Sequence, residues 1–74
     1  MAEGGIETYH GGGFWHNRIV GSSWVLDSYE LKDEARSAGR RHAIQRGMVH
    51  QVRYLSGRVE AVYDYHNVDS SVSA

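Results

Sequence analysis

Residues 31–47 (LKDEARSAGRRHAIQRG) constrain the fold most, because no other stretch of the chain has a clear helical period. At 100° per residue, a single stripe collects mostly small side chains: Leu31, Ala35, Ala38, Gly39 and His42, with Ala43 at its edge. Alanine and glycine bring little apolar area, so this helix must lie close to large side chains from elsewhere. A glycine in mid-helix costs about 1 kcal/mol relative to alanine. Its place on the stripe predicts a close approach of another element.

The ends of this helix carry signals of unequal strength. Asp33 and Glu34 lie in the expected first turn and arginines fill the second half, which suits the helix dipole. Gly47 is well placed just past the last helical residue, where φ is often positive. At the start, either Ser28 or Glu30 could act as the cap.

Segments with β-type patterns lie on both sides of the helix. Alternating residues separated by Gly- and Ser-rich turns predict four strands and a possible short first one: Ile6–His10, Phe14–Val20, Trp24–Tyr29, Met48–Leu55 and Val59–Tyr65. The expected fold is therefore α+β, with a small antiparallel sheet of two hairpins flanking one helix, (β)ββ-α-ββ. Residues 6–66 are expected to form a single domain, between a flexible tail at 1–5 and a disordered, Ser-rich tail at 67–74.

Strand alternation divides the side chains between two faces of this sheet. The helix is expected to cover one face: Trp15, Asn17, Ile19, Tyr29, His50, Val52, Tyr54, Val59, Ala61 and Tyr63. The second face also carries Gln51 and Glu60, and its interface candidates are Phe14, His16, Arg18, Val20, Trp24, Leu26, Arg53, Leu55 and Val62. An antiparallel sheet open to water usually has a polar outer face. Exposed apolar side chains interleaved with His and Arg predict an interaction surface instead.

Three interpretations of this second face are open. The sheets of two copies could meet in a homodimer, or the face could bind another protein. Its aromatic and arginine side chains could instead stack on and pair with nucleic acid. A register error of one residue would exchange the two faces and turn the patch into ordinary core.

Composition narrows the class of protein further. The chain has 74 residues, a net charge of −1 and no cysteine, which gives no disulfide and no thiolate metal site. It has no apolar run long enough to span a membrane and no leader pattern, so we expect a cytoplasmic location without membrane contact.

No combination of side chains predicts catalysis or a cofactor. His42 and His50 are expected to be hydrogen-bonded core residues, and His10 with His16 forms only a weak potential metal pair. No nucleophile lies beside a base, and a chain of this size offers little concavity. We therefore expect a non-enzymatic binding or assembly domain without metal or cofactor.

Several local motifs resemble a family of short bacterial proteins catalogued as domain of unknown function 2188. They are Trp15 in the first hairpin, Lys32-x-Glu34-Ala35 at the helix start, Gly39-Arg40 and Gly47 in and after the helix, Ser56-Gly57-Arg58-Val59 at a turn, and Asp64-Tyr65. The resemblance covers residues 9–67. His42 stands where the family usually has a larger apolar residue, and Leu31 where a capping Thr or Ser is common. The resemblance implies the same hairpin–helix–hairpin unit and brings no established activity.

Overall fold

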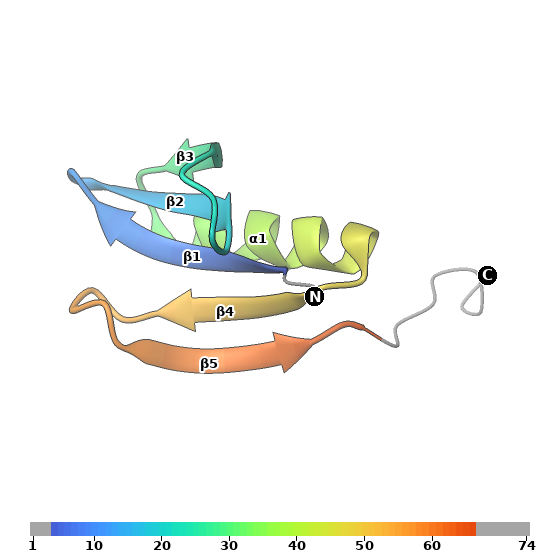
Figure 1. Ribbon diagram of the computed structural model, residues 1–74. Helices are drawn as coiled ribbons and strands as arrows, with labels where there is room; N and C mark the ends of the chain where they lie inside the picture. The colour runs from blue at the N-terminus through green and yellow to red at the C-terminus, as the bar shows by residue number, and fades with distance from the viewer. Residues whose placement is uncertain (1–3, 67–74) are drawn as a thin grey trace.

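The computed structural model describes residues 4–66, which form one sheet with one helix on it (Figure 1). The elements in chain order are β1 (Gly5–Gly11), β2 (Phe14–Ile19), β3 (Val25–Tyr29), α1 (Lys32–Arg46), β4 (Val49–Arg53) and β5 (Val59–Asp64). The α+β class is confirmed. Of the two expected tails, residues 1–3 and 67–74 lie outside the described residues.

The sheet is mixed, which corrects the expected antiparallel arrangement. Its strand order is β3-β2-β1-β4-β5, and the pairs β1–β2, β2–β3 and β4–β5 are antiparallel. The strands β1 and β4 pair in parallel, with Ile6 opposite His50 and Thr8 opposite Val52. Both expected hairpins are present, and the parallel pair joins them into one five-stranded layer.

The first strand is the centre of the sheet rather than an optional addition. It begins at Gly5, inside the segment expected to be a tail, and Gly5, Ile6, Glu7 and Thr8 are all buried. It is joined to β2 by a two-residue turn in which both glycines have positive φ, 63° at Gly12 and 89° at Gly13. Such a turn matches the twist of an antiparallel hairpin.

The C-terminal end of α1 agrees with the prediction, whereas the N-terminal end does not. Gly47 adopts the left-handed conformation (φ 65°), and the amide of Met48 donates to the carbonyl of Ala43 at 2.9 Å. This confirms the predicted C-terminal end. At the start, Leu31 occupies the cap position without a side-chain hydrogen bond, so neither Ser28 nor Glu30 caps the helix. Leu31 is 60% exposed and is not part of the buried stripe.

The buried face of α1 consists of Ala35, Ala38, Gly39 and Ala43, which are four of the six residues of the predicted stripe; His42 is only half-buried. This face packs on β1, β2, β3 and β4, whereas β5 lies outside the area that α1 covers. Several large side chains expected beneath the helix are therefore about half exposed: Tyr54, Val59 and Tyr63. The interior is small as a result, and its largest fully buried side chains include the polar Asn17, Thr8 and His50.

Two irregularities in strand pairing change the predicted faces. In β5, Ala61 is opposite Val52 and Val59 is opposite Arg53, so Glu60 is an extra residue in a bulge. Its carboxylate binds Lys32 on the helix side of the sheet, which corrects its predicted place on the open face. In β3, Leu26 is the extra residue of a similar bulge, between Val25 opposite Arg18 and Asp27 opposite Asn17.

Candidate interaction site

The structure separates the predicted interface residues into two groups. Those on the β2–β3 side of the sheet are Phe14, His16, Arg18, Val20, Trp24 and Leu26, and those on the β4–β5 side are Arg53, Leu55 and Val62. Phe14 is 44% and Trp24 73% exposed, so neither belongs to the interior with Ala35 and Ala38. The central strand β1 lies between the two groups.

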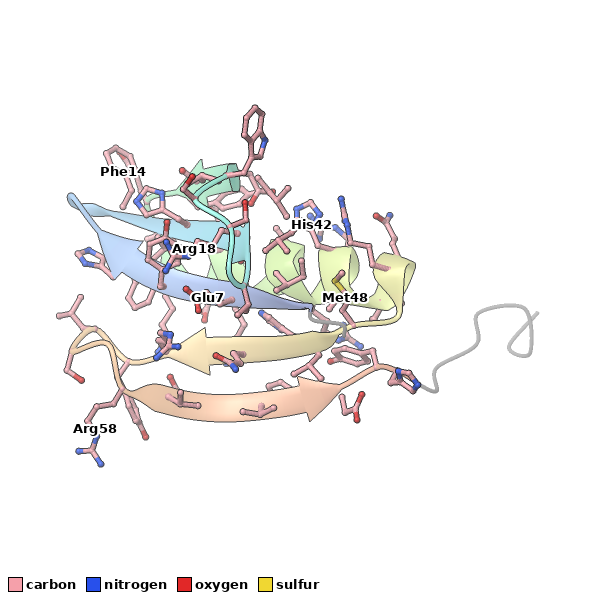
Figure 2. All side chains as sticks on the ribbon, viewed as in Figure 1. Glu7, Phe14, Arg18, His42, Met48 and Arg58 are labelled. Atoms are coloured by element: carbon pink, nitrogen blue, oxygen red, sulfur yellow. The ribbon has the colours of Figure 1, made fainter. Side chains whose placement is uncertain are left out.

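An ion-pair cluster occupies the middle of the open face, on the central strand β1, although the predicted face took its residues only from β2, β3, β4, β5 and the adjoining turns. Glu7 of β1 is 4% exposed and lies between two arginines on neighbouring strands. Its Oε2 accepts a hydrogen bond from Arg18 Nε at 2.7 Å and forms an ion pair with Arg18 Nη2 at 2.7 Å. Its Oε1 accepts a hydrogen bond from Arg53 Nη2 at 3.3 Å. Figure 2 shows Glu7 and Arg18 side by side on β1 and β2.

Further polar and cation–π contacts extend this cluster toward β3. The Arg18 guanidinium carbon lies 4.4 Å from the centre of the Tyr9 ring. His16 contacts Ser28 Oγ through Nδ1 at 2.6 Å and the Gly11 carbonyl through Nε2 at 2.7 Å. The middle of the open face is therefore polar and internally paired, and its exposed apolar side chains lie at the periphery.

We expect Glu7→Gln to destabilise the domain by about 1–2 kcal/mol, because a buried carboxylate is lost between two arginines. Both arginines are partly solvated, with 37% and 29% of their side chains exposed, which limits the effect. Urea unfolding followed by circular dichroism measures the change. Asp33→Asn is the control, because Asp33 is 88% exposed and makes only a surface pair with Arg36. An equal loss in both variants would contradict a special role for Glu7.

Five of the exposed large apolar side chains lie on the β4–β5 hairpin. We call this group the hairpin surface, and it consists of Tyr54, Leu55, Val59, Val62 and Tyr63, which are 45–68% exposed. Every residue of β5 except the half-buried Ala61 is exposed. The bulge at Glu60 places Val59 opposite Arg53 on the open face, while Tyr63 lies opposite His50 on the helix side. Apolar groups are thus exposed on both faces of this edge strand.

A chain of buried polar side chains runs beneath α1, from β3 to β4. Thr8 Oγ1 donates to Asn17 Oδ1 at 2.6 Å, and Asn17 Nδ2 donates to Asp27 Oδ1 and to the Ala35 carbonyl, both at 2.9 Å. These bonds fix the orientation of the Asn17 amide. Of this network, only His42 and His50 could be predicted as hydrogen-bonded core residues from the sequence.

At the β3 end of the network, Asp27 binds three partners. Its carboxylate accepts hydrogen bonds from His42 Nε2 at 2.8 Å, from the Tyr29 hydroxyl at 3.2 Å and from Asn17 Nδ2 at 2.9 Å. Burial alone would raise the pKa of the Asp27 carboxyl, but the hydrogen bonds from His42, Asn17 and Tyr29 outweigh it and hold this pKa below its usual value. His42 was predicted to be a hydrogen-bonded core residue: the hydrogen bond is confirmed, but the side chain is 24% exposed and lies at the margin of the core.

At the β4 end, the protonation of His50 follows from its partners. Thr8 gives its only hydroxyl hydrogen to Asn17, so it must accept from His50 Nε2, 2.8 Å away. Nε2 therefore carries the ring hydrogen and Nδ1 of the neutral ring is an acceptor. Burial, with repulsion from Arg36 and Arg40, lowers the pKa of His50 to about 4, so the ring is neutral at physiological pH.

The described residues give no sign of a metal site or a membrane span. Within residues 4–66 no three His, Asp or Glu side chains gather closely enough to hold a metal ion. His10 contacts Trp15 edge-to-face on the helix side, whereas His16 contacts Tyr9 and Ser28 on the open face, so the two do not converge. The helix of this part of the chain is too short and too polar to cross a bilayer.

Comparison with known proteins adds no information on function, so the proposal below is argued from the surfaces described above. No family model, no curated protein and no solved structure matches this chain. The resemblance to domain of unknown function 2188 therefore stays a prediction.

Proposed function

We propose that the protein is an assembly domain that forms a symmetric dimer, in which the β5 strands of two copies pair antiparallel. The supporting observation is that, among residues 4–66, β5 is an edge strand that pairs only with β4 and has exposed apolar side chains on both faces. Natural proteins usually protect such an edge with a covering element or with charges. Pairing two copies would satisfy the open backbone groups and remove apolar side chains from water.

The hydrogen-bond pattern of β4 and β5 identifies the backbone groups that would pair. The Tyr65 amide donates to the Met48 carbonyl, so Met48 and Tyr65 form a hydrogen-bonded pair. In an antiparallel ladder every second pair is of this kind, so His50–Tyr63 and Val52–Ala61 are hydrogen-bonded pairs as well. The N–H and C=O groups of Val62, which alternates with them, must point away from β4. Val62 therefore presents both a backbone donor and an apolar side chain at the free edge.

We expect Val62→Pro to abolish the dimer and leave the monomer folded, because proline removes the outward N–H without breaking a bond to β4. Sedimentation velocity over a concentration series, with circular dichroism to check the fold, measures both properties. Val62→Thr is the matched control, since it keeps the N–H and a β-branched side chain. A wild-type protein that sediments as a monomer at high concentration would refute the proposal, as would a Val62→Pro protein that still dimerises.

The alternative is a nucleic-acid-binding module that uses the basic and aromatic side chains of the open face. The ion pairs of Arg18 and Arg53 with Glu7 weigh against it, because a phosphate would have to compete with a buried carboxylate for both guanidinium groups. Salt-dependent binding of single- or double-stranded DNA or RNA that is lost in Arg18→Ala would favour this alternative over the dimer.

A further inference from the structure

A cavity of about 340 Å³ lies between α1 and the end of β5, on the helix side of the sheet. It exists because α1 stops short of β5. Its lining residues are Arg36, Ser37 and Arg40 from α1, His50 from β4, and Tyr63 and Tyr65 from the last strand and its continuation. The cavity thus has two cations on one wall, aromatic side chains on the other and an imidazole at its base.

The unusual group here is His50 Nδ1. The His50 side chain is 1% exposed, and Nδ1 has no hydrogen-bond partner among the described residues. Because the bond to Thr8 places the ring hydrogen on Nε2, Nδ1 is a buried acceptor that needs a donor. A buried acceptor without a partner is unfavourable, and such groups are rare in folded proteins.

The charges around this acceptor select the class of ligand. Arg36 and Arg40 are four residues apart on α1, and both lie close enough to disfavour a positive charge on His50. Arg36 makes an exposed pair with Asp33, while Arg40 makes no ion pair within residues 4–66. A ligand that suits this site must be an anion for the arginines and must also carry its own hydrogen for Nδ1.

We propose that this cavity binds a hydrogen-phosphate group, either free or as a monoester of a small molecule. Its oxygens accept hydrogen bonds from Arg36 and Arg40, and its P–OH group donates to His50 Nδ1. The Tyr63 and Tyr65 rings form the wall that an organic portion would contact. Because every lining residue comes from one protomer, this site does not depend on the proposed dimer.

The sharpest test compares phosphate with sulfate, which have similar size and shape. Near neutral pH, inorganic phosphate retains a hydrogen that it can donate, whereas sulfate retains none. A bound sulfate would place an oxygen without a hydrogen opposite the acceptor Nδ1, which weakens binding. We therefore expect phosphate to bind at least about tenfold more tightly than sulfate. Isothermal titration calorimetry gives the affinities, and the ¹⁵N resonance of His50 Nδ1 should shift with phosphate and stay in place with sulfate.

Two arginine variants show whether binding occurs at this cavity. Arg40→Gln should lower phosphate affinity about tenfold, because one of two charge-assisted contacts is lost. Arg41→Gln removes the same charge from an exposed position on the same helix outside the cavity, and it should leave the affinity unchanged. Val62→Pro should also bind phosphate normally, which separates this inference from the proposed dimer.

A third ligand, phenyl phosphate, shows whether the site prefers free phosphate or a phosphate monoester. Its affinity is measured near pH 6, where about half of a monoester still carries its hydrogen. Tighter binding of phenyl phosphate than of inorganic phosphate would identify a monoester, and the reverse would identify the free ion; both support the site. Equal binding of sulfate and phosphate, no binding of either, or equal losses in Arg40→Gln and Arg41→Gln would overturn it.

Discussion

Gly39→Ala is expected to lower the free energy of unfolding by about 3 kcal/mol or more, although alanine is the better helix former. A Cβ atom at this position would lie 2.5 Å from Asn17 Oδ1 and 2.6 Å from both His50 Nε2 and Thr8 Oγ1. These three atoms belong to buried residues, and Thr8 Oγ1 is hydrogen-bonded to both of the others, so none can move without disturbing the polar network. Overpacking of this kind outweighs the gain of about 1 kcal/mol in helix propensity.

Urea unfolding followed by circular dichroism tests this expectation, and Gly11→Ala is the matched control. At Gly11 the nearest atoms would be 3.9 Å from the new Cβ, which is ordinary contact, so the same chemical change should have little effect. A Gly39→Ala protein as stable as the wild type would show that α1 can move away from the sheet without loss. Since a domain of this size has only about 5 kcal/mol of stability, a loss of about 3 kcal/mol would raise the unfolded fraction from roughly 0.02% to about 3%.

The second large effect is a loss of stability on acidification, caused by His50. Its pKa is about 4 in the folded protein, against an ordinary value of 6.5. Between these values the unfolded chain takes up a proton at this residue and the folded protein does not. The free energy of unfolding therefore falls as the pH decreases from about 6.5 to 4, by up to about 3 kcal/mol, and is fully retained above this window.

His50→Gln keeps a donor for Thr8 but cannot titrate, so its stability should depend less on pH across the same window. Chemical unfolding of both proteins at a series of pH values gives the two slopes, and NMR titration of the His50 ring gives its pKa directly. Identical slopes, or a His50 ring that titrates near 6.5, would contradict the expectation. Carboxylates such as Asp27 contribute at lower pH in both proteins and cancel in the comparison.

The helix could be predicted from the sequence because its information is local. The period of Ala35, Ala38, Gly39 and Ala43 defines one face, and Gly47 has the conformational freedom that the C-terminal end requires. The close approach at Gly39 could also be inferred, since a glycine on the buried stripe needs a reason. The identity of the atoms that approach it could not, because they come from three separate strands.

The first strand was predicted at Ile6–His10, but its central and buried place in the sheet could not be, because that burial depends on distant partners. Glu7 and Thr8 look like surface residues until the arginines, the amide and the imidazole that bind them are brought close, from as far as 46 residues away. The parallel pairing with β4 is likewise not visible in alternation. The predicted apolar face combined residues of β2, β3, β4 and β5, including Arg18 and Arg53, but omitted Glu7 of β1, which binds both arginines.

The bulges explain a further difference in the candidate site. Alternation assigns Glu60 to the open face and Val59 to the helix side, and a single extra residue in β5 exchanges both assignments. No residue type in this stretch marks the insertion. Face assignments by alternation were therefore reliable for the middle of each strand, such as Arg18 and Val62, and failed next to the turns.

The parallel pairing of β1 with β4 also has a consequence for how the chain reaches its native state. Ile6 is opposite His50, so the middle of the sheet closes only after the helix and the strand that follows it have been synthesised. While only the first three strands and α1 have left the ribosome, the edge of β1 that pairs with β4 is exposed to other nascent chains. Premature termination before β4 should thus yield a fragment prone to aggregation rather than a smaller folded unit.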